Sequence, residues 1–194
     1  NIIVGYNYHF GKDASGKSSD LVDSGLIYGF KAVIIPAFKI GHKVVSSSHI
    51  RKFINEGKIK EANEFLGRLY YLEGKVVKGH GIGKKIGFPT ANLVIDSEKL
   101  LPKPGVYSII ADVRNKEYFG FCNVGFQPTF NDREKQLVVE VNLFDFDIDI
   151  YGESIGVYFV DYLRDVQKFS SVEALIEELK IDKIKAIESV RRNI

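Results

Sequence analysis

Between residues 70 and 163, apolar residues recur at every second position in segments that are separated by turn-forming residues. The segments are 70–79, 105–114, 117–126, 135–146 and 153–163. Alternation with a period of two is typical of strands that bury one face, and no helical pattern interrupts the series. The sequence therefore predicts a mainly β fold, built as a small antiparallel barrel or sandwich.

The residues before this β region alternate between strand and helix patterns. Residues 1–10 and 30–38 contain short apolar strands, with a loop rich in glycine, serine and aspartate after the first, and residues 44–70 contain two short helices. Such alternation is typical of the end of an α/β unit. Because the first apolar stretch begins at residue 1, we expect further chain upstream.

The two predicted helices carry end signals. Ser47 or Ser48 can cap the first helix, Gly57 can end it, and Gly67 can end the second. The change from helical to alternating patterns places a domain boundary near residues 68–71. The predicted domains are an α/β domain, 1–69, and a β domain, 70–194.

The chain ends in helical patterns. Ser170 and Glu173 match a capping box. The apolar residues that follow share one face of the helix: Val172, Leu175, Ile176 and Leu179. From Asp182 onward we expect a second, more polar helix, with Ile184 and Ile187 turned inward.

The charge balance disfavours a nucleic-acid module. The 194 residues include 27 basic and 25 acidic ones, for a net charge of +2, whereas a nucleic-acid binder usually carries a basic excess. The helix pair at 48–66 resembles a helix-turn-helix and the barrel resembles an OB-fold. The acidic segment 144–153 disfavours that alternative further.

Cysteine content and hydropathy set the expected compartment. The single cysteine, Cys122, excludes an internal disulfide framework and a cysteine-rich zinc site, and it fits a reducing environment. No apolar run reaches the ~18 residues that a membrane span requires. We expect a cytoplasmic protein without membrane or nucleic-acid partners, and a monomer by default.

The segment 79–92, GHGIGKKIGFPTAN, is the strongest candidate for chemistry. Closely spaced glycines let backbone N–H groups turn towards an anion, and Lys84 and Lys85 add positive charge. The glycines alone fit a plain hairpin loop equally well. Thr90 and Asn92 favour the functional interpretation, because residues two apart on an extended segment face the same way and their oxygens can join phosphates and waters around Mg²⁺.

Glu140 and Arg164 are the other candidates. Strand alternation places Glu140 on the face opposite Val139 and Val141. A strand glutamate most often faces solvent, but in a pocket its carboxylate can accept a hydroxyl proton. Arg164 can pair with a phosphate or a carboxylate, although an isolated arginine is more often a surface charge.

Four segments resemble riboflavin kinase, in the order of that family: 74–93, 101–110, 123–130 and 138–171. The motif Pro-Thr-Ala-Asn after a glycine-rich basic loop, followed by a glutamate on a later strand, is specific to it. The resemblance implies a six-stranded antiparallel Greek-key barrel with a C-terminal helix. It also implies transfer of the γ-phosphoryl group of ATP to the 5′-hydroxyl of riboflavin, giving FMN.

The resemblance implies a role for each matching position. Thr90 and Asn92 would ligate Mg²⁺ and contact ATP, and Glu140 would be the base for the riboflavin hydroxyl. Arg164 and Gln167 would lie beside the flavin. The implied nucleotide flap is Gly79, His80, Gly81, Gly83, Lys84 and Lys85, and the implied border of the adenine nucleotide is Leu143, Asp145 and Tyr151.

The chain also departs from the family pattern. The family often has arginine at the positions of Lys84 and Lys85, and bacterial members often have Glu and Lys where this chain has Val166 and Gln167. Lysine keeps the charge of arginine but loses its bidentate geometry. A non-catalytic flavin-binding barrel, acting as a sensor or carrier, is the alternative function.

Segments 4–17 and 44–68 resemble the end of the FMN adenylyltransferase module of the bacterial bifunctional riboflavin kinase/FAD synthetase. The resemblance implies that residues 1–69 are the C-terminal part of a Rossmann-like α/β nucleotidyltransferase domain. The residues implied to hold nucleotide phosphates there are Ser46, Ser47, Ser48 and Arg51. The His-x-Gly-His signature of that module does not occur. We therefore expect FAD synthesis only from a full-length protein.

Overall fold

The computed structural model describes all residues except 80, 129–134 and 194. The chain forms two compact units, Asn1–Ser46 and Ser47–Ile194. Within the described residues, no helix is long and apolar enough to cross a membrane.

The first unit is a small α/β arrangement. Strands β1 (Ile2–Gly5) and β4 (Ala32–Ile35) pair in parallel, and helix α1 (Ser18–Tyr28) lies between them in the chain. The unit also contains two short antiparallel pairs and a 3-10 turn: β2 (His9–Phe10), η1 (Lys12–Ala14), β3 (Gly16–Lys17), β5 (Lys39–Ile40) and β6 (Lys43–Val44). The predicted α/β pattern is confirmed, but α1 was not predicted because it begins inside the polar segment that resembles a loop.

The second unit begins with the two predicted helices, α2 (Ser47–Asn55) and α3 (Ile59–Leu66). Gly57 and Gly67 have φ angles of 75° and 67°, in the left-handed region that favours glycine at helix ends.

The compact unit starts earlier than the predicted boundary near residues 68–71, because α3 packs on the barrel. The Asn63 side chain donates a hydrogen bond to the Phe159 carbonyl (2.9 Å) and accepts one from the Tyr70 amide (2.7 Å). Ile59 belongs to the barrel core cluster. These contacts make the helix pair part of the same compact body as the strands.

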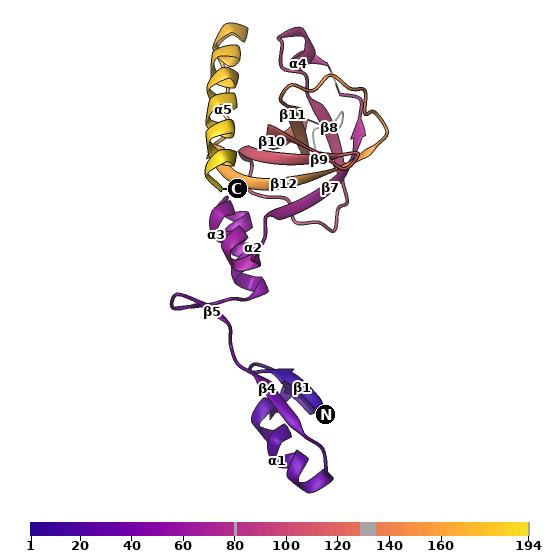
Figure 1. Ribbon diagram of the computed structural model, residues 1–194, viewed down its shortest axis with the longest axis vertical. Coiled ribbons are helices and arrows are strands. Elements are labelled where there is room, and N and C mark those ends of the chain that lie inside the picture. The colour runs from indigo at the N-terminus through magenta and orange to yellow at the C-terminus, as the bar shows by residue number, and fades with distance from the viewer. Residues whose placement is uncertain (80, 129–134, 194) are drawn as a thin grey trace. The chain divides into compact units, whose positions relative to one another are not determined.

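Six strands form a closed antiparallel barrel in the order β10-β11-β8-β7-β12-β9 (Figure 1). The strands are β7 (Tyr70–Val77), β8 (Ala91–Ile95), β9 (Gly105–Val113), β10 (Lys116–Pro128), β11 (Lys135–Leu143) and β12 (Ser154–Arg164). The barrel that the family resemblance implied is confirmed. The alternation pattern missed β8, because it is short and directly follows the glycine-rich segment.

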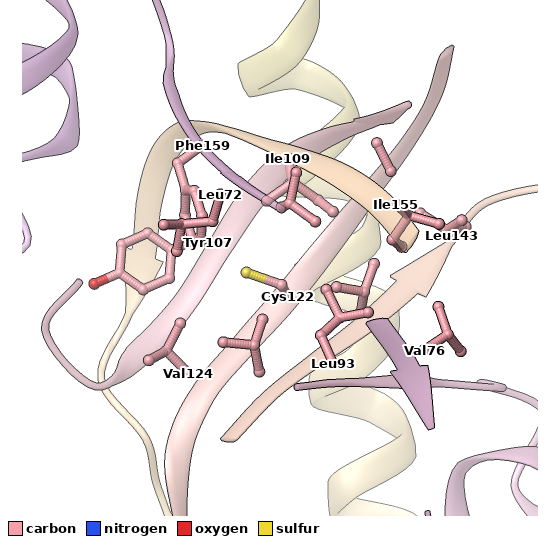
Figure 2. Packing of buried hydrophobic residues seen from close by; sticks show 14 of the residues in the cluster. Leu72, Val76, Leu93, Tyr107, Ile109, Cys122, Val124, Leu143, Ile155 and Phe159 are labelled. Atoms are coloured by element: carbon pink, nitrogen blue, oxygen red, sulfur yellow. The ribbon is translucent and has the colours of Figure 1, made fainter. Parts of the chain in front are cut away.

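Alternate residues of each strand fill the barrel interior. Figure 2 shows Leu72, Tyr107 and Cys122 in this packing. Val139, Val141 and Leu143 belong to the same cluster, as the alternation of β11 predicted. Their neighbours in sequence, Glu140 and Asn142, therefore point to the outside of the barrel.

Helix α5 (Val172–Asn193) packs along β9, β10 and β12 on the outside of the barrel (Figure 1). It is one continuous helix rather than the two that were predicted. The hydroxyl oxygen of Ser171, not Ser170, accepts a hydrogen bond from the Ala174 amide (3.2 Å) at its start.

The prediction that Ile184 turns inward was wrong, because this side chain is exposed. Asp182, expected to begin a polar helix, is fully buried, and Val172, at the start of the apolar face, is exposed. Ile187 does pack against a buried cluster, as predicted. Asp182 is buried because Arg164 neutralises it, a partner that lies 18 positions earlier in the chain and is invisible to helical periodicity.

Candidate functional site

Two cavities meet at Thr90. The first has a volume of about 280 Å³ and contains Thr90, Asn92 and Glu140 in its lining. The second has a volume of about 370 Å³, with Lys84, Thr90 and Tyr151 in its lining. Thr90 is thus a lining residue that the two cavities share.

The first cavity contains a row of three polar side chains, each from a different strand. Glu140 of β11 pairs with Asn92 of β8 on one side and with Asn123 of β10 on the other. Residues directly opposite each other in neighbouring strands point to the same face of the sheet. All three line the cavity. The structure thus brings together the predicted residues Thr90, Asn92 and Glu140, and adds Asn123.

The glycine-rich segment packs closely against these polar residues. A β-carbon on Gly79 would lie 2.0 Å from Nδ2 of Asn92, and one on Gly83 would lie 2.3 Å from the Phe88 carbonyl oxygen. Gly83 lies within the short helix α4 (Ile82–Lys85). Gly79 is therefore required by the close approach of the segment to Asn92, and Gly83 by the tight fold of the segment against its own Phe88 carbonyl.

The remaining residues of the predicted flap do not all line the same cavity. Gly81 has a φ angle of 68° and lines the first cavity, and the side chain of Lys84 lines the second. Lys85 is exposed. His80 lies outside the described residues.

Asn142 connects the strand of Glu140 to the segment that carries Thr90. Its side chain is only 4% exposed and donates a hydrogen bond of 2.7 Å to the carbonyl oxygen of Pro89. This bond holds the residue before Thr90 against β11. Sequence reasoning missed Asn142, although its place two residues after Glu140 puts both on the same strand face.

Arg164 is held by carboxylates of α5. Its Nε lies 2.9 Å from Oδ1 of Asp182, its Nη2 lies 2.7 Å from Oδ2, and Oε1 of Glu178 lies 3.4 Å from Nε. Asp182 is 0% exposed, and the Arg164 guanidinium also lies 5.7 Å from the centroid of the Phe169 ring. Arg164 and Asp182 both line the first cavity. The commoner expectation of a surface charge was wrong for Arg164.

The next residue, Asp165, is anchored separately. Its carboxylate accepts hydrogen bonds of 2.7 Å from both Lys103 Nζ and Tyr162 Oη. Both hydrogen bonds lower the pKa of Asp165, and the bond from Lys103 has the larger effect. Arg164 is thus held by α5, and Asp165 by Lys103 and Tyr162.

Of the other predicted site residues, some line a cavity and one does not. Leu143 and Tyr151 line the second cavity, and Gln167 lines the first. Asp145 does not line the second cavity, because it lies in a turn with φ of 52° and its side chain is 95% exposed. A strand pattern extended to residue 146 could not reveal that turn.

The serine cluster divides between the two units. Ser46 ends the first unit, whereas Ser47, Ser48 and Arg51 lie in α2 of the second and are exposed.

The side-chain oxygens of this site could hold a hard cation such as Mg²⁺ only if a bound phosphate or water completed its coordination. Within the described ranges, no group of three or more His, Cys, Asp or Glu side chains could hold a metal ion. The side chains of Thr90 and Asn92 face the first cavity and have no hydrogen-bond partner among the described residues. Such neutral oxygens fit Mg²⁺ when phosphates and waters supply the other ligands.

Comparison with known proteins shows which family the chain resembles. The Flavokinase family model, described as riboflavin kinase, matches residues 66–190. The chain is 34% identical over 186 residues to the bifunctional riboflavin kinase/FMN adenylyltransferase of Bacillus subtilis, covering 95% of this chain and 58% of the relative. It is 35% identical over 185 residues to the protein of the same name from Listeria monocytogenes, with coverage of 94% and 57%.

A solved structure has the same fold over nearly the whole chain. The crystal structure described as a macrolide-efflux protein from Streptococcus pneumoniae matches with a TM-score of 0.86 and 36% identity, covering 95% of this chain and 59% of that one. The chain thus spans less than three-fifths of the length of these relatives. The family model, in contrast, matches most of this chain, including the barrel, the residues that line both cavities and most of α5, and the chain belongs to the riboflavin kinase family.

Proposed function

We propose that the β domain, residues 70–194, transfers the γ-phosphoryl group of ATP to the 5′-hydroxyl of riboflavin, producing FMN and ADP. The observation that carries this proposal is that Thr90 lines both cavities, the first with Glu140 and Asn92 in its lining and the second with Lys84 and Tyr151. Phosphoryl transfer requires two substrates that meet end to end, with their reacting atoms aligned.

The second cavity is the nucleotide site in this proposal. Lys84 and the backbone of the glycine-rich flap neutralise phosphate oxygens, while Leu143 and Tyr151 border the adenine nucleotide. Thr90 and Asn92 would hold Mg²⁺ together with the phosphates, and the bound ion would supply charge neutralisation for the transferred group. Asp145 is too exposed to join this border and is left out of the assignment.

The first cavity is the flavin site. Phe88, Phe121, Leu175 and Leu179 give it apolar walls that suit a flat aromatic ring, and Gln167 adds a polar contact. Arg164 is already engaged by Asp182. In this proposal Arg164 therefore forms part of the cavity wall and holds α5 in place, and it does not bind a phosphate.

Glu140 is the general base. Its carboxylate accepts the proton of the riboflavin 5′-hydroxyl as that oxygen bonds to the γ-phosphorus, and the bond from phosphorus to the β,γ-bridging oxygen breaks to release ADP. The direct pairing of Glu140 with Asn92 keeps the base one strand away from the proposed phosphate ligands.

Residues 1–69 belong, in this proposal, to the FMN adenylyltransferase module of a longer protein. Ser46, Ser47, Ser48 and Arg51 contribute to phosphate binding there. The longer protein is expected to convert FMN and ATP into FAD, whereas residues 1–194 alone are not.

The kinase proposal is tested by incubating the 194-residue chain with riboflavin, Mg²⁺ and ATP labelled in the γ-phosphate. We expect one label per FMN molecule formed, with ADP in equal amount. Riboflavin that binds but acquires no label would favour the non-catalytic flavin-binding barrel instead.

A further inference from the structure

The lining of the first cavity is sorted by strand. Thr90 and Asn92 lie at β8, Glu140 on the neighbouring β11, Asn123 on β10 beyond it, and Val106 on β9 after that. Neighbouring strands are about 4.8 Å apart. The lining therefore changes from neutral oxygens, through a carboxylate and a carboxamide, to apolar side chains over the width of four strands.

The order of these lining residues matches the order of chemical groups along riboflavin, the proposed acceptor. With the phosphoryl donor at Thr90 and the reacting hydroxyl at Glu140, the rest of the acceptor must extend towards β10 and β9. Beyond Asn123 the walls are mainly apolar, from Val106 of β9 and from Leu175 and Leu179 of α5. The charged side chains there, Arg164 and Asp182, are paired with each other. The part of the acceptor beside Asn123 therefore lies between the reacting hydroxyl and the apolar ring.

The carboxamide of Asn123 is available for a ligand. It is half-buried and lines the cavity directly opposite Glu140, and it has no hydrogen-bond partner among the described residues. A β-carbon on Gly125 would lie 3.4 Å from Asn123 Nδ2, so glycine keeps that flank of the carboxamide open. Its polar atoms remain accessible from the cavity, so a ligand that enters can exchange hydrogen bonds with them in place of water.

We infer that Asn123 binds the ribityl hydroxyls next to the reacting one, and so selects flavins that carry a polyol chain. Asn123 lies about one strand spacing from Glu140, on the side away from Thr90. A carboxamide both donates and accepts, which matches hydroxyl groups on successive carbons. The inference rests on the proposed function for the direction in which riboflavin lies.

The test compares riboflavin with lumiflavin, which has the same ring system but no polyol chain. Binding of each flavin is measured by fluorescence quenching without ATP or Mg²⁺. Asn123→Leu should weaken riboflavin binding ~10-fold and change lumiflavin binding less than about twofold, because one or two hydrogen bonds to the polyol are lost. Asn123→Ala is measured alongside to separate the lost amide from any effect of the leucine side chain.

Leu175→Ala is the matched control, since it removes an apolar wall of the same cavity. It should weaken both flavins by similar factors. Equal weakening of both flavins by Asn123→Leu, or no preference of the wild-type protein for riboflavin, would overturn the inference. Wild-type binding with the expected preference but no phosphorylation would instead refute the proposed function and leave the polyol contact standing.

Discussion

Glu140 of β11 lies directly opposite Asn92 of β8, and both side chains line the same cavity outside the barrel. The pairing is fixed by the core, because Val139 and Val141 on either side of Glu140 are buried inside. A slip of one residue would exchange these faces and bury the carboxylate. Barrel packing thus sets the geometry of the proposed base.

Glu140→Gln should lower turnover by ~100-fold or more, because the amide keeps the shape of the carboxylate but cannot accept the hydroxyl proton. ATP binding should change little. Steady-state kinetics and nucleotide titration measure the two effects. Glu117→Gln, on an exposed part of β10, is the control and should retain full activity. Near-normal turnover of the Glu140 variant would contradict the assignment of the base.

Thr90→Val should weaken nucleotide binding much more in the presence of Mg²⁺ than in its absence. Valine has nearly the shape of threonine but lacks the oxygen that is proposed to join the ion. Isothermal titration with ADP, with the ion present or replaced by a chelator, measures the difference. An equal loss under both conditions would argue that Thr90 contacts the nucleotide directly or shapes the cavity.

The strands of the barrel could be predicted because their signal is local. Val139, Val141 and Leu143 alternate with polar residues, and this alternation correctly places Glu140 outside the barrel. Thr90 could be selected because it belongs to a motif that is contiguous in sequence. Local periodicity and short motifs therefore carried the prediction of both the fold and the proposed centre of the site.

Contacts between distant segments could not be predicted. Asp182 resembles a residue of a solvent-facing helix turn until Arg164 is placed against it. Asn142 gains its meaning only from the Pro89 carbonyl, more than fifty residues earlier. Asn123 becomes notable only through its pairing with Glu140. Each of these contacts depends on how strands pair or how the helix docks, and neither can be predicted from the residues that are adjacent in sequence.

Arg164→Leu should lower the free energy of unfolding by roughly 3 kcal/mol, because it leaves the buried Asp182 carboxylate without its cation. Urea unfolding measures the change. Replacing both residues, as Arg164→Leu with Asp182→Leu, should recover much of the loss, since the fully buried charge is gone and the remaining carboxylate, Glu178, is partly exposed. A single variant as stable as the wild type would show that solvent or another group already satisfies Asp182.

Cys122 gives the unfolding free energy a dependence on alkaline pH. The thiol is fully buried in the barrel core, and burial raises its pKa because the thiolate would lose its hydration. In the unfolded chain the thiol ionises near its ordinary pKa of about 8.5. The folded state therefore binds the proton more tightly, and the resulting stabilisation is present below about pH 8.5 and is lost as the pH rises above that value.

Cys122→Ala isolates this effect from the buried tyrosines, whose pKa values are also raised by burial. Between pH 8.5 and 9.5 the wild-type protein should lose up to ~1 kcal/mol more unfolding free energy than the variant, because one pKa unit corresponds to about 1.4 kcal/mol when titration is complete. Urea unfolding at the two pH values measures this difference. The cavity left by alanine lowers the unfolding free energy equally at both pH values and therefore does not affect the comparison.

In native buffer the wild-type thiol should also resist alkylation by maleimide and react only in denaturant, since burial suppresses the reactive thiolate and shields it from the reagent. Parallel pH dependence of the two proteins, together with rapid alkylation of the folded chain, would mean that Cys122 is reached by solvent through opening of the barrel.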